Sequence, residues 1–247
     1  KNGDEWLGGA HGIAWRHQDS VQLFISTNQI GPEDVFTFAE ASDGRVWCGT
    51  PHKVWEFNGK NWLPLRGGFE QINALHCGRE GTLWVATRHG LFRFTQGAWI
   101  ANGREDGLPS TDVRRISEDA TGRITVETAG GWSAFHPEVD PDAPRTYLNQ
   151  RPEDAARFRE GSVVSLGFHG RDKWKMTSPD RLLFSYRLDE REWSPFQEQS
   201  EISFTDLPLG KHYFQVRALD RNGNIDPKPA RLEFAVVVPW YRETRLV

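Results

Sequence analysis

One short phrase recurs in four copies within the first 136 residues, and it limits strongly what the chain can fold into. Residues 43–50 read DGRVWCGT, and residues 80–87 read EGTLWVAT. A third copy stands at residues 3–9, and a degenerate fourth at residues 121–128 has lost its tryptophan. The aligned marker positions, which are separated by 41, 37 and 41 residues, are Trp6, Trp47, Trp84 and Thr125. A period of about 40 residues is typical of β-propeller repeats.

Each full repeat contains four short apolar stretches with turn residues between them. The Asp-Gly and Glu-Gly pairs supply the positive-φ positions of a tight hairpin turn ahead of the marker strand. Four strands in about 40 residues predict a propeller blade. The first repeat lacks an opening strand and the fourth has no clear closing strand, so two complete blades and two part-blades are expected over residues 1–136. Since propellers usually have four to eight blades, we expect the C-terminal part of a larger propeller.

The repeat ends near residue 136, and a second all-β unit is expected beyond it. Residues 137–144 are rich in proline and acidic residues, which is typical of a stiff linker. Residues 145–238 then contain short candidate strands separated by turns, the pattern and size of an Ig-like or fibronectin-III-like β-sandwich. The candidate strands are residues 146–148, 162–168, 182–188, 202–204, 212–219 and 231–238.

Two phrases in this second unit predict local structure. Residues 207–218 are typical of a tyrosine corner, in which the Tyr213 hydroxyl would bond back to upstream backbone and pin the turn. Further on, Asp220, Asn222 and Asn224 alternate as they do in a calcium-binding loop. No glutamate follows them at the required distance, so we expect a tight turn here and no metal site.

The two halves together resemble a known arrangement of bacterial sensors. The Asp-Gly-x-x-Trp-x-Gly-Thr phrases look like two-component-regulator propeller repeats, and the second half is similar to the Ig-like domain that follows those propellers. That domain is named for three recurring tyrosines, whose counterparts here are Tyr186, Tyr213 and Tyr241. The positions that carry the resemblance, and for which we expect a structural role, are Trp6, Trp47, Trp84, Tyr186, Trp193, Gly210, Tyr213, Trp240 and Tyr241.

The resemblance implies the extracytoplasmic sensor region of a membrane-bound, often hybrid, two-component histidine kinase. Residues 239–247 would then lead to a transmembrane helix, in the periplasmic part of a bacterial inner-membrane protein. The resemblance also implies a homodimer through the Ig-like domain, no cofactor, no catalytic residue in this region, and a ligand that is often an oligosaccharide. Two features depart from the family pattern, namely a single Pro239 where two prolines are common and the missing tryptophan of the fourth repeat.

Composition narrows the function classes further. The chain is 37% hydrophobic and 12% aromatic with a net charge of −4, which argues against disorder and against a global attraction to nucleic acid. Its longest apolar run, residues 234–240, is far shorter than the roughly 18 residues of a membrane span. Cys48 and Cys77 lack the spacing of a zinc site and are expected to be small buried hydrophobes. A disulfide between them is the alternative, which the sequence alone does not place.

Polar residues recur at one position of the repeat, five residues after the marker. Because equivalent positions on a propeller fall on one rim, that rim is a candidate ligand surface. The candidate residues are His11, His52, Lys53, Arg88, His89 and Trp132. The alternative, which we weigh more heavily, is that a tolerated turn residue was duplicated with the repeat. A metal site is disfavoured because the histidines come from separate blades without a nearby carboxylate or cysteine partner.

Two classes of function stay open at this point. The first is a non-enzymatic sensor that relays ligand binding through the Ig-like domain to a cytoplasmic kinase and so to transcription. The second is a secreted, lyase-like propeller enzyme acting on polysaccharide, or else an adhesive module without signalling. An enzyme would need a clustered acid and base, and the sequence contains no GxSxG, HExxH or P-loop motif. We therefore favour the sensor.

Overall fold

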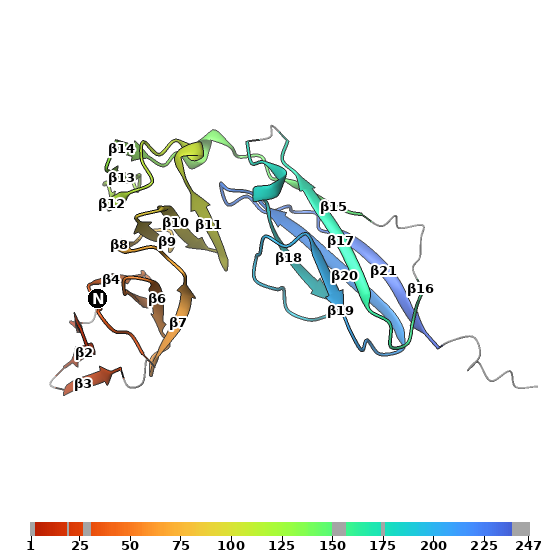
Figure 1. Ribbon diagram of the computed structural model, residues 1–247, viewed down its shortest axis with the longest axis horizontal. Coiled ribbons are helices and arrows are strands. Elements are labelled where there is room, and N and C mark those ends of the chain that lie inside the picture. The colour runs from red at the N-terminus through yellow and green to blue at the C-terminus, as the bar shows by residue number, and fades with distance from the viewer. Residues whose placement is uncertain (1–2, 19, 27–30, 150–156, 174–175, 239–247) are drawn as a thin grey trace, which may run out of the picture. The chain divides into compact units, whose positions relative to one another are not determined.

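The structure is a computed structural model, which describes residues 3–18, 20–26, 31–149, 157–173 and 176–238 (Figure 1). Every regular element in these ranges is a β-strand or a single-turn 3-10 helix, so the fold is all-β as predicted. The chain divides into two compact units, residues 1–136 and 137–247. No helix of the described ranges combines the length and the apolar character that a membrane crossing needs.

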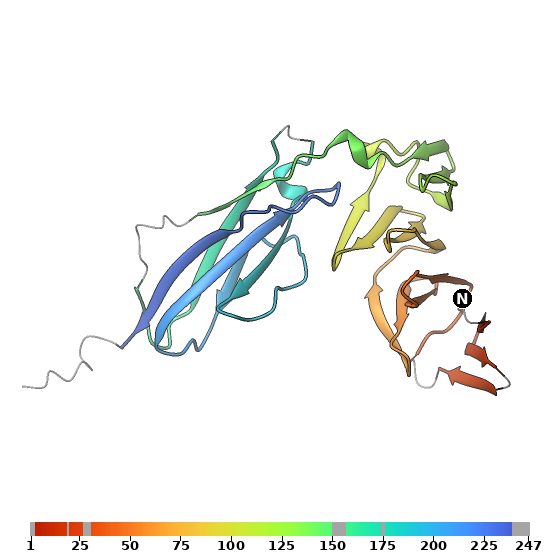
Figure 2. The ribbon, with the colours of Figure 1, turned by 180° about the vertical axis from the view of Figure 1, so that it is seen from behind.

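The first unit is a series of four antiparallel sheets, here called blades 1 to 4, which follow one another along the chain (Figures 1 and 2). Blade 1 has β1 (Glu5–Gly9), β2 (Gly12–His17) and β3 (Ser20–Ile25), and blade 2 has β4 (Thr37–Glu40), β5 (Val46–Gly49), β6 (Lys53–Phe57) and β7 (Trp62–Gly67). Blade 3 has β8 (Ile72–Cys77), β9 (Leu83–Thr87), β10 (Gly90–Thr95) and β11 (Ala98–Asn102), and blade 4 has β12 (Val113–Glu118), β13 (Ile124–Thr128) and β14 (Gly131–Ala134). These are the two complete and two partial blades that the repeat predicts, and the described sheets do not close into a ring.

Each marker tryptophan packs against the next blade, which buries Trp47 and Trp84 fully and Trp6 in part. Trp6 contacts Trp62 of blade 2 edge to face, with ring centroids 5.3 Å apart. Trp47 shares a core cluster with β8 and β9 of blade 3, and Trp84 shares one with β12 and β13 of blade 4. Thr125 takes the marker position in blade 4, after which the chain enters the second unit. A tryptophan is therefore needed only where another blade follows to cover it.

The two cysteines are separate thiols in these inter-blade cores. Cys48 is fully buried, and burial raises the pKa of its thiol. Cys77 is only half-buried, so the prediction of two buried hydrophobes holds fully for Cys48 alone.

The second unit is a sandwich of two sheets. One sheet has the order β15 (Arg145–Leu148), β17 (Val164–Arg171) and β19 (Glu201–Phe204), and the other has β16 (Arg157–Arg159), β21 (Ala230–Val237), β20 (Gly210–Leu219) and β18 (Leu183–Leu188). Side chains of both sheets form one core around Phe168, Phe184 and Phe214. The six candidate strands are all present. The additional β16 has only three residues and one apolar anchor, Phe158, which is too weak a signal to detect in the sequence.

The prediction of a tyrosine corner at Tyr213 is wrong. Strand β20 alternates so that His212 and Phe214 point into the core, and the Tyr213 side chain is 51% exposed. The buried His212 takes the corner's place, with Nε2 2.9 Å from the Pro208 carbonyl oxygen and Nδ1 3.0 Å from Asp189 Oδ2. The turn is thus pinned by an imidazole one position earlier in the chain.

The other residues that carry the resemblance are structural where they are described. Tyr186 is half-buried and packs its ring against Phe204 and Phe214 of the core. Trp193 lies beneath two guanidinium groups, with Arg217 Cζ 4.2 Å and Arg187 Cζ 4.8 Å from its ring centroid. Gly210 begins β20 with a φ of +130°. Trp240, Tyr241 and the predicted exit segment 239–247 lie outside the described residues.

Candidate ligand-binding rim

A threonine three residues after the marker builds the same turn in three blades. The Thr50, Thr87 and Thr128 hydroxyls donate to the carbonyl oxygens of Lys53, Gly90 and Gly131, over 3.1, 2.9 and 2.8 Å respectively. Each bond closes the turn between the marker strand and the strand that follows it. The two residues inside each turn are therefore held at the tip, which explains why the repeat ends in threonine. We call the tip residues 10–11, 51–52, 88–89 and 129–130 the turn rim.

The connections between blades lie against the turn rim. Ser26 N donates to the His11 carbonyl over 3.1 Å, and Ile72 N donates to Pro51 O over 2.8 Å. Arg88 N donates to the Gln71 carbonyl oxygen over 3.1 Å, and Ala129 N donates to Asp112 O over 2.9 Å. Every turn is thus tied to a connection, and the four equivalent turns lie on the rim where the chain passes from blade to blade.

The structure brings His52 and His89 to one connection. His52 Nδ1 lies 3.0 Å from the Phe69 carbonyl oxygen, so that nitrogen carries the proton. His89 Nδ1 lies 3.0 Å from a carboxylate oxygen of Glu70, and both side chains are mostly exposed. The two imidazoles belong to neighbouring blades and meet at residues 69–70.

A groove of about 510 Å³ opens beside His52. Its other lining residues are Phe36, Pro51, Gln71, Ile72 and Asn73. The Phe36 side chain is 50% exposed, whereas Ile72 is buried. An apolar ring beside an imidazole and an amide is a combination that binds a polar organic molecule by stacking and hydrogen bonding.

The remaining candidate residues are dispersed over the first unit. His11 lines a separate hollow of about 310 Å³ on blade 1. Lys53 and Arg88 are exposed on the turn side of blades 2 and 3, and Trp132 is 61% exposed on β14 of blade 4. Blade 4 has Gly130 where the others have histidine, because a Cβ there would come within 2.9 Å of the Pro109 carbonyl oxygen.

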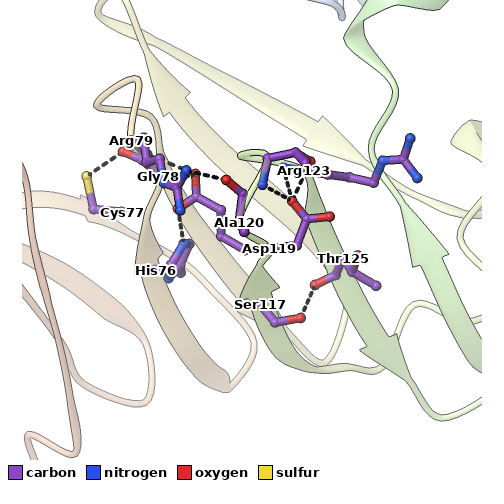
Figure 3. A network of polar contacts seen from close by, with 11 residues as sticks. His76, Cys77, Gly78, Arg79, Ser117, Asp119, Ala120, Arg123 and Thr125 are labelled. Carbon is purple, nitrogen blue, oxygen red and sulfur yellow. Dashed lines mark hydrogen bonds and ion pairs between the residues drawn. The ribbon is translucent and has the colours of Figure 1, made fainter.

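A second polar site joins blades 3 and 4, and the sequence gives no signal for it (Figure 3). His76 Nε2 lies 3.2 Å from Glu118 Oε2, while Arg79 N donates to Glu118 Oε1 over 3.2 Å. Arg79 Nη1 also donates to the Ala120 carbonyl oxygen over 2.8 Å. Glu118 is only 11% exposed, so this cluster holds two blades together rather than presenting groups to a ligand. His76 and Glu118 stand at non-equivalent repeat positions, which hides the pair from a search for periodicity.

The described residues thus form a run of propeller-type sheets followed by a two-sheet Ig-like sandwich. Residues 175–237 match the family model described as the Y_Y_Y domain. The match lies within the second unit, the part of the chain that resembles the three-tyrosine Ig-like domain.

Solved structures with similar folds come from several bacterial proteins. The extracellular domain assigned to the hybrid two-component system BT3049 of B. thetaiotaomicron is 16% identical, with a TM-score of 0.40 over 96% of this chain and 43% of that one. The corresponding domain of BT4673 from the same organism is 18% identical, with a TM-score of 0.44 over 98% and 36%. Virginiamycin B lyase from Staphylococcus aureus is 10% identical, with a TM-score of 0.35 over 93% and 64%. This chain thus spans less than half of either sensor structure. No curated protein sequence matches it.

Proposed function

We propose that this chain is the extracytoplasmic, ligand-sensing region of a membrane-bound two-component sensor kinase. The observation that carries the proposal is the match of residues 175–237 to the Y_Y_Y domain, in the unit that follows a run of propeller blades. In the family that the sequence resembles, these two parts stand in this order between ligand and membrane. The chain itself is not an enzyme in this proposal, and the parent protein holds the kinase.

The turn rim is the proposed ligand surface of the first unit. The groove beside His52 offers a half-exposed phenyl ring, an imidazole and the Asn73 amide side by side. Those groups suit a small molecule or an oligosaccharide, whose ring faces stack on aromatic side chains and whose hydroxyls pair with polar groups. Lys53 and Arg88 would favour a ligand that carries negative charge.

Blade 1 supports the proposal that the propeller is larger than the described sheets. Strands β1 and β3, at the edges of blade 1, expose apolar side chains. In blades 2 to 4, side chains of this kind are buried in the cores between blades. The exposed residues, each between 62% and 65%, are Leu7, Val21, Leu23 and Ile25. A row of this kind is a surface that another blade would cover.

The second unit is the proposed transmitter. Ligand binding would shift it against a dimer mate, and the membrane helices would carry the change to the kinase. Such coupling requires the ligand to bind one arrangement more tightly than the other. The homodimer through the Ig-like domain and the periplasmic location are part of this proposal and rest on the family resemblance.

A binding screen on the purified chain tests the rim directly. The chain would be titrated by calorimetry with oligosaccharides from plant, host and microbial polysaccharides, and each mixture would be assayed for turnover. We expect binding without cleavage, and we expect His52→Ala to weaken it about tenfold, the cost of losing one hydrogen bond to the ligand. His169→Ala, in the second unit, is the matched control. Cleavage of a polysaccharide, or unchanged binding to His52→Ala, would contradict the proposal.

A further inference from the structure

Three buried aspartates meet at one end of the Ig-like sandwich. Asp140 follows the 3-10 helix η2 (Pro137–Val139), Asp172 follows β17, and Asp220 follows β20. Their exposed fractions are 2%, 1% and 0%. One carboxylate oxygen from each residue lies within 4.8 Å of the others. The three residues are far apart in the sequence, so only the fold brings them together.

Several oxygens of this cluster have no hydrogen-bond partner among the described residues. They are both carboxylate oxygens of Asp140 and Oδ1 of Asp172. Buried polar atoms are nearly always satisfied in folded proteins, and a carboxylate left without a partner indicates an unseen ligand or ion. The Asp140 carboxylate, with two unpaired oxygens in a buried site, is the strongest such indication in the described chain.

The remaining oxygens are held in place by the surrounding loops. Thr177 N donates to Asp172 Oδ2 over 2.8 Å. Asp220 Oδ1 accepts from the backbone N–H groups of Asn222 and Asn224, each over 2.8 Å. The Asn224 amide donates both to Asp220 Oδ2 and to the Asp140 carbonyl oxygen, each over 2.8 Å. The cluster is thus preorganised, with its free oxygens left for something other than protein.

The charge of the cluster is not balanced by protein. None of the three carboxylates forms an ion pair with a lysine, arginine or histidine of the described residues, and Lys173 pairs instead with Asp142. Burial raises the pKa of Asp140, and the neighbouring Asp172 and Asp220 carboxylates raise it further. Burial also raises the pKa of Asp220. Three like charges in a buried site are unfavourable unless a cation or protons neutralise them.

We propose that Asp140, Asp172 and Asp220 bind a divalent cation, Ca²⁺, at this end of the sandwich. Calcium takes oxygen ligands at about 2.3–2.6 Å, so two ligand oxygens of one ion lie no more than about 5 Å apart. The three carboxylate oxygens, all within 4.8 Å of one another, meet that limit. It also accepts bidentate carboxylates, for which Asp140 has two free oxygens. Mg²⁺ usually keeps several waters, which a site with side chains at most 2% exposed does not favour.

The ion would hold residues 137–144, the first segment of the second unit, against the sandwich. Asp172 and Asp220 follow strands of different sheets, while Asp140 belongs to the segment 137–144 that the sequence predicts as a linker. That segment is not free of the sandwich, since Asp140 is buried and its carbonyl accepts from both Asn222 and Asn224. The turn at residues 220–224 therefore is present as predicted, and it contributes one ligand of a site whose other ligands lie elsewhere.

Calcium titration of the whole chain tests this inference. After treatment with EGTA and buffer exchange, the chain would be titrated with CaCl₂ by calorimetry, and its thermal unfolding recorded with EGTA and with CaCl₂. We expect one Ca²⁺ per chain and a rise of the second unit's melting temperature on the order of 10 °C at a concentration about 100 times Kd. MgCl₂ should give a smaller rise. Asp140→Asn should weaken Ca²⁺ binding at least about tenfold.

Two variants keep the test decisive. In EGTA, Asp140→Asn should melt no lower than the unchanged chain, because it removes one of three repelling charges, and only its response to Ca²⁺ should be lost. Asp142→Asn, two residues away and paired with Lys173, should respond to Ca²⁺ as the unchanged chain does. Absence of Ca²⁺ binding in the unchanged chain would overturn the proposal, as would an undiminished response of Asp140→Asn. Binding of Mg²⁺ but not Ca²⁺ would overturn the choice of ion.

Discussion

The two units of this chain bury their interiors in different ways. In the first unit each core cluster lies between neighbouring blades and is filled by repeated aromatic and aliphatic side chains. In the second unit one core closes on itself, and polar groups are buried around it, among them His212, Asp220 and Asp226. The first unit therefore depends mainly on neighbour-to-neighbour packing, as repeat proteins do, with the His76–Glu118 contact between blades 3 and 4 as a polar addition. The second unit depends more on buried polar groups that respond to protons and ions.

The largest loss of stability is expected when a tryptophan that packs between two blades is removed. Trp84→Ala should destabilise the first unit by about 3–5 kcal/mol, because Trp84 is 3% exposed and its removal leaves a cavity against β12 and β13. Denaturant unfolding monitored by far-ultraviolet circular dichroism measures this. Trp132→Ala, at a 61% exposed site, is the control and should change the free energy of unfolding by less than about 0.5 kcal/mol. An equal loss of unfolding free energy in both variants would contradict the conclusion that the first unit depends on packing between neighbouring blades.

A smaller loss of stability is expected when the buried hydrogen bonds of Asp226 in the second unit are removed. Asp226 accepts from the Thr146 N–H and hydroxyl, each over 2.7 Å, and from Lys228 N over 2.8 Å. Asp226→Ala should cost about 2–3 kcal/mol, since it leaves buried donors without an acceptor. The exposed Asp180 gives the matched control, and Asp180→Ala should leave the unfolding midpoint of the second unit unchanged. If Asp226→Ala unfolds like its control, these polar contacts do not stabilise the sandwich.

The stability of the second unit should depend on pH through His212. Burial lowers the pKa of His212, but its contacts with the Pro208 carbonyl and the Asp189 carboxylate outweigh burial and the opposing charge of Arg191, so the pKa is raised. Both nitrogens face acceptors, and only the imidazolium donates to both. Because the folded-state pKa is raised, this stabilisation is fully present below about pH 6.5, and it is lost as pH rises through the folded-state value.

Loss of one of the two hydrogen bonds should cost about 1 kcal/mol. Thermal unfolding between pH 5.5 and 8.5 measures it, and the pH dependence should disappear in His212→Gln. The exposed His169 provides the control, and His169→Gln should keep the slope. A His212→Gln variant that retains the slope would assign it to another group.

The Tyr213 hydroxyl should contribute less to the stability of the second unit than Asp226 or His212. Its side chain is 51% exposed and its backbone N–H, which donates to Asp189 Oδ1 over 2.9 Å, is unaffected by substitution. Tyr213→Phe should therefore shift the free energy of unfolding by less than about 0.5 kcal/mol. A loss of about 1 kcal/mol or more in thermal or denaturant unfolding would restore the tyrosine corner that the structure rejects.

The sequence predicts the first unit better than the second because its structurally important residues recur at a regular spacing. Recurring Trp and Thr positions identify blades, turns and the common rim without any knowledge of the third dimension. The sequence predicts the wrong residue for the corner at Tyr213 because adjacent residues of a strand point to opposite faces, and the phrase does not say which residue points inward. The aspartate cluster gives no signal in the sequence for a different reason. Asp220 alone lies in a recognisable loop, and Asp140 and Asp172 join it only through tertiary structure.

The central claim is that the first unit senses a ligand and the second transmits the event. Under the proposed function the full-length protein is a membrane-bound kinase, and its autophosphorylation, measured in proteoliposomes with a ligand found by the binding screen, tests the claim most directly. We predict that the ligand changes the phosphorylation rate, that His52→Ala shifts the response to higher ligand concentration, and that the rate without ligand stays unchanged. A protein that lacks kinase activity, or that binds the ligand at the rim with no change in phosphorylation, would contradict the account.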